Sequence, residues 1–269
     1  MTEAIRSVNR AAAVLRAVAA GGSSGVRQVD IVEATGLQKT TAHRLLTTLV
    51  DIGWLDQDVE TGAFHVGLPM VEFGLKALNR NGLLDIANPS LLRLAGKTGD
   101  TVYFSVRSGA EALCIDRVTG SFPIRTLTLR VGDRRPLGLG AGSLALLAWL
   151  DDAEIERILA LAPATPPYPA PESAATWDAI KVARRLGYAV NDGGVVPGAV
   201  GVGVPVFSAR REPVAALSVA AVESRLGPGR MPEVGASLQE EASVVAAALE
   251  RLAPGINSAG MRRLLPQDD

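Results

Sequence analysis

The sequence predicts an α+β chain with an N-terminal winged helix-turn-helix domain and a C-terminal mixed α/β domain whose sheet is mainly antiparallel. Three observations predict it: an amphipathic segment after a glycine turn at 36–49, a hairpin pattern directly after it, and β-rich runs alternating with helical segments beyond residue 100. A length of 269 residues also favours two domains. The expected divisions are a winged-helix domain at 1–68, a linker helix at 69–81, a mixed α/β domain at 82–255 and a disordered tail at 256–269.

The segment 36–49, GLQKTTAHRLLTTL, has the pattern of a turn followed by a DNA-recognition helix. Gly36 stands where the preceding helix must stop, because glycine adopts the left-handed conformation without strain. The opposite face from the apolar stripe is polar and contains no acidic residue before Asp51, so it suits a phosphate backbone. The apolar stripe has the i, i+3, i+4, i+7, i+8 spacing of a helix with one buried face: Ala42, Leu45, Leu46, Leu49 and Val50.

The neighbouring segments complete the motif. A first helix is expected over Val8 to Ala20, and a short second helix in VRQVDIVEATG is expected to bury Val29, Ile31 or Val32, and Ala34. The segment GWLDQDVETGAFHVG, residues 53–67, places two short apolar runs around an acidic turn, which predicts a β-hairpin. A helix-turn-helix followed by a hairpin is a winged helix.

Charge limits how such a domain binds DNA. The whole chain has a net charge of −1, and residues 1–80 hold eight Lys or Arg and eight Asp or Glu. No general basic field attracts nucleic acid, so binding must rely on local side chains and on several copies of the domain. We therefore expect an assembly that presents several DNA-binding domains.

Cysteine content and apolar runs point to the cytoplasm. The single cysteine, Cys114, excludes an intrachain disulfide framework, and no signal sequence is visible at the N-terminus. The longest uncharged stretches, 136–150 and 193–209, are too short to span a membrane. We expect a cytoplasmic protein without membrane contact.

The second domain begins after the helical connection 69–80 and the Asn81-Gly82 stop. Helices are expected around 91–98, 141–149, 152–161 and 174–186, with a proline-rich exposed loop after 161. A final helix carries an apolar stripe from Val234 to Leu252. Strands are expected at 101–106, 111–118 and 124–130, in GYAV, in VGVGVPVF and in PVAALSVAAV, which gives five or six largely antiparallel strands.

The residue inventory argues against an enzyme. The two histidines, His43 and His65, are both in the first domain, so residues 82–269 offer no histidine for a nucleophile pair or for a metal. Cys114 lies inside an apolar strand pattern, where a packed thiol is expected rather than a nucleophile. The GAGS segment lacks the lysine and spacing of a phosphate-binding loop. We expect no catalytic residue, no cofactor and no metal ion.

The order of several motifs resembles bacterial transcription regulators of the isocitrate-lyase-regulator (IclR) type over roughly residues 5–252. The similar segments are SVNRAAAVLRAVA, GLQKTTAHRLLTTL, GWL with its hairpin, DRV at 116–118, VGDRRPL at 131–137, GYAVNDGG and PVAALSV. The resemblance implies a GAF-like effector domain, a dimer or tetramer on a palindromic or repeated operator, and DNA affinity controlled by a small metabolite. It also implies a DNA-contacting set: Gln38, Lys39, Thr40, Thr41, His43, Arg44 and Thr47.

Within that set, we assign base contact to Arg44, because a guanidinium pairs bidentately with guanine. Phosphate contacts are assigned to Lys39, Thr40 and Thr41 near the helix start. For His43, a half-buried capping or packing role competes with DNA contact.

The effector domain departs from the family pattern. Where members have Pro-Leu-His-Ala-Thr/Ser-Ala-x-Gly-Lys-Ala, this chain has PLGLGAGSLA, and only Ser218 keeps the identity found in sensors of small oxo acids. Asp192 is the acid that would serve if one is needed, since 191 is Asn. We expect a roomier, less polar pocket for an aromatic or branched-chain carboxylic acid, held by backbone N–H groups at a helix start. The candidate effector residues are Ala141, Gly142, Ser143, Asn191, Asp192, Gly201, Ser218 and Ala220.

Two alternatives remain open at this point. The glycine-rich stretch 193–205 is either part of a ligand site or simply a strand with a bulge. The C-terminal domain either senses a ligand or serves only to oligomerise a ligand-independent, architectural DNA-binding protein. A cavity lined by the candidate residues favours the sensor, and a filled core favours the assembly role.

Overall fold

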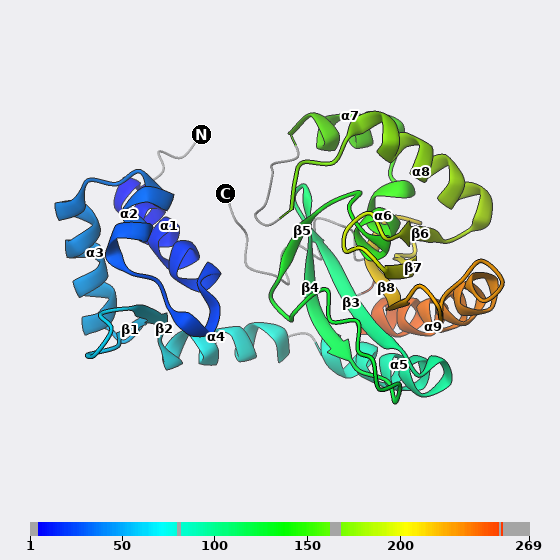
Figure 1. The fold of residues 1–269 in the computed structure, drawn as a ribbon, viewed down its shortest axis with the longest axis horizontal. Coiled ribbons are helices and arrows are strands. Elements are labelled where there is room, and N and C mark those ends of the chain that lie inside the picture. The colour runs from blue at the N-terminus through cyan, green and yellow to red at the C-terminus, as the bar shows by residue number, and fades with distance from the viewer. Residues whose placement is uncertain (1–4, 80–81, 162–167, 253, 255–269) are drawn as a thin grey trace. The chain divides into compact units, whose positions relative to one another are not determined.

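The computed structural model describes residues 5–79, 82–161, 168–252 and 254 (Figure 1). The chain divides into two compact units, Met1–Ala77 and Leu78–Asp269. Within the described ranges, none of the helices combines the length and apolar character that a membrane span requires. The tail expected at 256–269 lies outside the described residues.

The first unit is a winged helix. Its elements, in chain order, are α1 (Arg6–Ala20), the 3₁₀ turn η1 (Gly22–Ser24), α2 (Gln28–Thr35), α3 (Lys39–Asp51), β1 (Leu55–Gln57), β2 (Phe64–Val66) and α4 (Leu68–Asn79), which crosses the boundary between the units. α2 ends at Gly36, whose φ of 65° is the left-handed conformation that the sequence predicts there.

The core of this unit lies between α1, α2, α3 and the hairpin. α3 buries Ala42, Leu46 and Leu49, as its apolar spacing predicts. The prediction that α2 buries Val29 and Ala34 is wrong, because both are exposed and Ile31 alone is fully buried. Val29 lies about 200° around the helix from Ile31, so the two side chains cannot reach the same core.

The wing is a short antiparallel hairpin. Leu55 of β1 pairs with Val66 of β2, and Val26 adds a bridge to Phe64 through two backbone hydrogen bonds. At the tip, the Asp58 carboxylate accepts hydrogen bonds from the backbone N–H of Thr61 (2.7 Å) and Glu60 (2.9 Å). These bonds, Thr61 first, hold the pKa of Asp58 below its usual value, and they fix the acidic turn that the sequence predicts.

The second unit is a single antiparallel sheet covered on both faces. Its strands follow the order β5-β4-β3-β8-β7-β6, and every neighbouring pair is antiparallel. The strands are β3 (Thr101–Ser108), β4 (Glu111–Val118), β5 (Arg134–Pro136), β6 (Ala189–Asp192), β7 (Ala199–Phe207) and β8 (Pro213–Val222). The helices are α5 (Leu83–Thr98), α6 (Ala141–Ala148), α7 (Asp152–Leu161), α8 (Ser173–Leu186) and α9 (Met231–Leu252).

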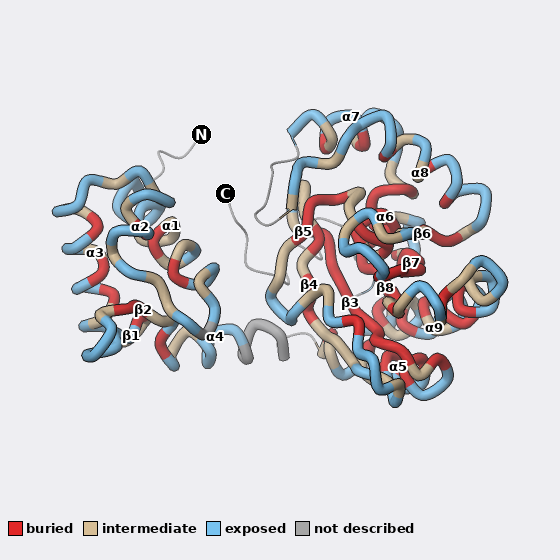
Figure 2. Tube along the Cα trace, in the orientation of Figure 1, coloured by how far each residue is buried: buried red, intermediate tan, exposed pale blue. Residues whose placement is uncertain are grey.

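The two faces of the sheet form two separate cores. One packs against α5 and α9 and contains Phe104, Val202 and Leu217, and the other packs against α6, α7 and α8 and contains Leu144 and Ala216. The strand β3 between the two cores is buried along most of its length (Figure 2). Successive side chains of a strand point to opposite faces, so β3 sends Phe104 to the first core and its neighbours to the α6 side. The sheet confirms the predicted mainly antiparallel α/β domain.

The strand predicted at 124–130 is not formed, and the short β5 takes the edge position beside β4. Side chains, not a neighbouring strand, make several hydrogen bonds to the backbone of this segment. The Tyr103 hydroxyl donates to Thr126 O (2.6 Å) and accepts from Thr128 N (3.1 Å), and the Arg117 Nη1 donates to Leu129 O (2.9 Å). Because these bonds come from residues distant in the sequence, the local pattern could not show them.

Tyr103→Phe is expected to destabilise this domain by about 1–3 kcal/mol. The Tyr103 side chain is buried, and removal of its hydroxyl leaves Thr126 O and Thr128 N without this partner. Urea denaturation of the full chain measures this. Tyr188→Phe is the matched control, since Tyr188 is also buried and its hydroxyl makes no hydrogen bond to any described residue. Equal unfolding midpoints for the two variants would contradict the anchoring role of Tyr103.

Candidate DNA interface and ligand pocket

The polar face of α3 is exposed to solvent. Thr41 is half-buried, and the other six predicted residues are exposed: Gln38, Lys39, Thr40, His43, Arg44 and Thr47. Within the described part of the chain, the side chains of Lys39, Arg44 and His43 make no hydrogen bond or ion pair. Six of the seven predicted residues are therefore exposed on α3 or just before it, and no other described residue occupies the donors of Lys39, His43 and Arg44.

Contacts outside this set position the helix. The Gln28 side-chain amide donates to Lys39 O (3.3 Å), which ties α2 to the start of α3. Thr48 Oγ1 donates to Arg44 O (2.8 Å) within the helix, so its hydroxyl is used. His43 is exposed, which disfavours a half-buried packing role and favours contact with DNA.

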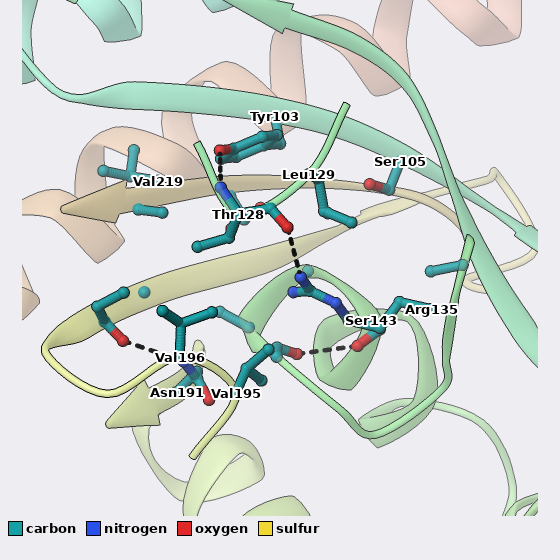
Figure 3. Close-up of a pocket in the computed structure, with 18 of the residues that line it drawn as sticks. Tyr103, Ser105, Thr128, Leu129, Arg135, Ser143, Asn191, Val195, Val196 and Val219 are labelled. Atoms are coloured by element: carbon teal, nitrogen blue, oxygen red, sulfur yellow. Dashed lines mark hydrogen bonds between the residues drawn. The ribbon is translucent and has the colours of Figure 1, made fainter. Parts of the chain in front are cut away.

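The pocket of the second unit lies where the start of α6 meets the sheet (Figure 3). α6 approaches β7 so closely that a Cβ at Gly203 would be 2.5 Å from Ala141 O, a distance that side chains do not tolerate. Glycine at this position lets the helix N-terminus lie directly over the strands. The glycine-rich stretch 193–205 is thus in part a packing surface for α6. The register shift of β7 against β8 falls at Val206/Phe207, after this stretch.

Seven of the eight candidate effector residues line this pocket, and Asp192 does not. The lining candidates are Ala141, Gly142, Ser143, Asn191, Gly201, Ser218 and Ala220. Asp192 is exposed at the end of β6. Because Asn191 faces the pocket, the next residue of the strand points to the other side. The suggestion that Asp192 supplies an acid to the pocket is therefore wrong.

The pocket also has lining residues that the sequence patterns did not predict. Tyr103, Ser105 and Arg135 contribute polar groups, and Leu129, Val195 and Val196 contribute apolar surface. The strand alternation of β3 could have indicated Tyr103 and Ser105, which share the face opposite Phe104. The cavity measures only about 40 Å³, so the roomy pocket expected from the sequence is not present in this conformation.

Comparison with known proteins decides the family. The family model described as "Bacterial transcriptional regulator IclR C-terminal" matches residues 75–247, and the "IclR helix-turn-helix domain" model matches residues 7–59. The chain belongs to the IclR family. It is therefore a transcriptional regulator with a helix-turn-helix domain of the kind that binds DNA operators.

Relatives in the IclR family cover nearly the whole chain. The HTH-type transcriptional regulator XynR of Escherichia coli (strain K12) is 29% identical over 247 residues, which is 91% of this chain and 97% of XynR. An IclR regulator structure from Alicyclobacillus acidocaldarius has a TM-score of 0.78 at 25% identity and covers 91% of this chain and 99% of its own. An IclR homolog from Microbacterium hydrocarbonoxydans, complexed with 4-hydroxybenzoate, has a TM-score of 0.72 at 23% identity, with 91% and 99% coverage.

These relatives are regulators and not enzymes, and the structure gives Cys114 no catalytic setting. Burial raises the pKa of the Cys114 thiol to about 12, and the nearby Asp133 carboxylate adds to that rise. The thiol is therefore neutral, and its Sγ lies 3.6 Å from Asp116 O. It lies outside the residues that line the pocket. Within the described residues, no cluster of three or more His, Cys, Asp or Glu side chains could hold a metal ion.

Proposed function

We propose that this IclR-family regulator reads its operator with α3 and that a carboxylic acid with an apolar body, bound in the pocket beside α6, changes its operator affinity. The observation that carries the proposal is the pocket: most of the candidate residues meet around the N-terminus of α6, in a domain attached to a winged helix. A filled core at this place would have favoured the alternative, a domain that only oligomerises.

On the DNA side, Arg44 pairs with a base edge and Lys39, Thr40 and Thr41 hold phosphates. The exposure of these side chains supports the assignment for Lys39, Thr40 and Arg44, and His43 joins the contact surface. Lys39 and Arg44 are the two strong cations between residues 36 and 50. Since so few phosphates are neutralised by each domain, a homodimer or homotetramer binds a repeated or palindromic operator.

On the effector side, Leu129, Val195, Val196 and Val219 supply apolar walls. The 4-hydroxybenzoate bound to the Microbacterium homolog supports an aromatic acid as one candidate class. A cavity of about 40 Å³ holds only a few water molecules, so an acid of this size must displace part of the wall. The connection 193–198 has no helix or strand, so we propose that its residues Val195 and Val196 are the part of the wall that moves.

The test measures operator affinity of the full chain by fluorescence anisotropy, with DNA from the promoter regions beside its gene. A panel of aromatic and branched-chain acids is expected to contain one that changes the dissociation constant by roughly 5- to 150-fold, the usual range of allosteric coupling. Two- and three-carbon acids are the control class, and a response to these alone would contradict the apolar part of the proposal. Operator affinity that no acid changes would favour the ligand-independent alternative.

A further inference from the structure

We propose that Arg135 recognises the carboxylate in this pocket and that the effector is therefore a monoanionic acid. The carboxylate would lie between the Arg135 guanidinium and the N-terminus of α6. This inference rests on the proposed function, because it names the charge and the recognition residue of the same pocket.

Arg135 is a buried cation without a counterion. It is 6% exposed, it is the one charged residue that lines the pocket, and within the described residues it forms no ion pair. Its surroundings contrast with those of Arg107, an equally buried arginine that pairs with the Glu154 carboxylate. A buried charge without a partner is costly, so the pocket retains a strong preference for an anion.

The hydrogen bonds of Arg135 are incomplete. Its Nη2 donates to Thr128 O (2.9 Å) and to the Tyr168 hydroxyl (3.1 Å), and the guanidinium lies over the Tyr168 ring at 4.6 Å from the centroid. Nε is buried with no acceptor, and Nη1 makes no hydrogen bond to a described residue. A guanidinium carries five N–H donors, so the N–H of Nε and the two of Nη1 remain available.

The free end of the guanidinium is directed toward the start of α6. A Cβ placed at Gly140 would be 2.6 Å from Arg135 Nη1, so this atom lies directly against the N-cap residue of the helix. Figure 3 shows the Arg135 side chain extending from β5 into the pocket toward Thr128. The absence of a side chain at Gly140 is what leaves room for the guanidinium.

The N-terminus of α6 has donors to offer at the same place. No side chain caps the helix, and the backbone N–H groups of Ala141, Gly142 and Ser143 have no acceptor among the described residues. The Ser143 hydroxyl is shared between the preceding carbonyl oxygens Leu139 O and Gly140 O. It therefore does not accept a hydrogen bond from the free N–H groups of the helix start. Free N–H groups at the positive end of a helix and an unpaired guanidinium together form a site for one carboxylate.

The surrounding residues select the class of anion. The lining holds one cation and no acid, and the remaining walls are apolar or uncharged. A dianion such as inorganic phosphate would bring a second charge for which no second cation is present. An acid with a single carboxylate on an aromatic or branched aliphatic body matches both parts of the pocket.

The experiment compares acids with their uncharged amides in calorimetric titrations of the full chain. The probes are benzoate, 4-hydroxybenzoate, phenylacetate and 3-methylbutanoate, each paired with its carboxamide, and inorganic phosphate. The tightest acid is expected to bind about 10- to 150-fold more strongly than its amide, the range for hydrogen bonds to a charged group. Arg135→Met should remove most of the acid's advantage over its amide, with the remainder due to the N–H groups of α6. It should leave the affinity for the amide unchanged, which also shows that the pocket is intact.

Arg134→Met is the matched control, since Arg134 bonds to Glu111 and Ser108 and does not line the pocket, and it should keep the wild-type preference. Equal binding of acid and amide by the wild-type chain would overturn the role of Arg135, even if Arg135→Met failed to fold. Binding of inorganic phosphate more tightly than any of the acids would overturn the inference that the effector is a monoanion. In either case an acid that still changes operator affinity would leave the proposed function standing. Operator affinity insensitive to every probe would instead remove the proposed function.

Discussion

Arg44→Ala is expected to weaken specific operator binding by the full chain at least about 30-fold. Arg44 is exposed on α3, and its guanidinium has no partner among the described residues. A bidentate contact with guanine contributes about 1–3 kcal/mol, and each recognition helix of an oligomer loses it, so two helices raise the dissociation constant by roughly 30-fold to more than 1,000-fold. Fluorescence anisotropy at one fixed salt concentration measures the change.

Two variants separate this effect from a general loss of charge. Arg185→Ala removes an exposed arginine at the end of α8, in the other unit, and should leave operator affinity unchanged. Lys39→Ala should weaken binding to all sequences alike and lower the salt dependence by about one phosphate contact. Size-exclusion chromatography should give the same oligomer for all three variants. An Arg44→Ala protein with the wild-type footprint would refute the assignment of base contact.

The winged helix could be predicted because its signals are local. The positions of Ala42, Leu46 and Leu49 determine which face of α3 is buried, and Gly36 stops the helix before it. Both depend on residues within a few positions in the chain. The prediction that Val29 and Ala34 are buried is wrong because the local signal in α2 is weak. A helix of eight residues is too short for its apolar residues to define one face.

The strand predicted at 124–130 failed because its backbone partners are not local. Ile124 and Leu127 are exposed, so the apolar residues of this segment do not mark a buried face. Its carbonyl groups are instead held by Tyr103, Arg117 and Arg135. Nothing in the pattern of the segment itself distinguishes a strand from an extended chain anchored by side chains.

Most of the predicted residues that line the pocket came from the family resemblance, and few came from physical chemistry. The resemblance pointed to the small residues around α6 and the sheet, but it could not show that Arg135 fills the space beside Gly140. Of the adjacent arginines, Arg135 faces the pocket and Arg134 bonds to Glu111. That choice depends on the register of the three-residue β5 against β4, which the sequence does not determine.

Asp100→Asn is expected to lower the free energy of unfolding of the effector domain by about 1–3 kcal/mol, because the buried carboxylate accepts charge-assisted hydrogen bonds from two partly exposed arginines. The Asp100 side chain is 2% exposed and accepts from Arg225 Nε (2.8 Å) and Arg230 Nη1 (2.9 Å). Both arginines also donate to Thr98 O, the carbonyl that ends α5. The asparagine would place an N–H group against donors and release both arginines from this helix end.

A matched substitution shows whether burial is the cause. Asp178→Asn also removes a carboxylate paired with a cation, Lys181 at 3.0 Å, but both of those side chains are more than 70% exposed. Solvent screens such a pair, so its loss should change stability by no more than about 0.5 kcal/mol. Urea denaturation of the full chain compares the two variants under one condition. If Asp100→Asn lowers the midpoint no further than Asp178→Asn does, the Asp100, Arg225 and Arg230 cluster does not hold α5 to the β8–α9 connection.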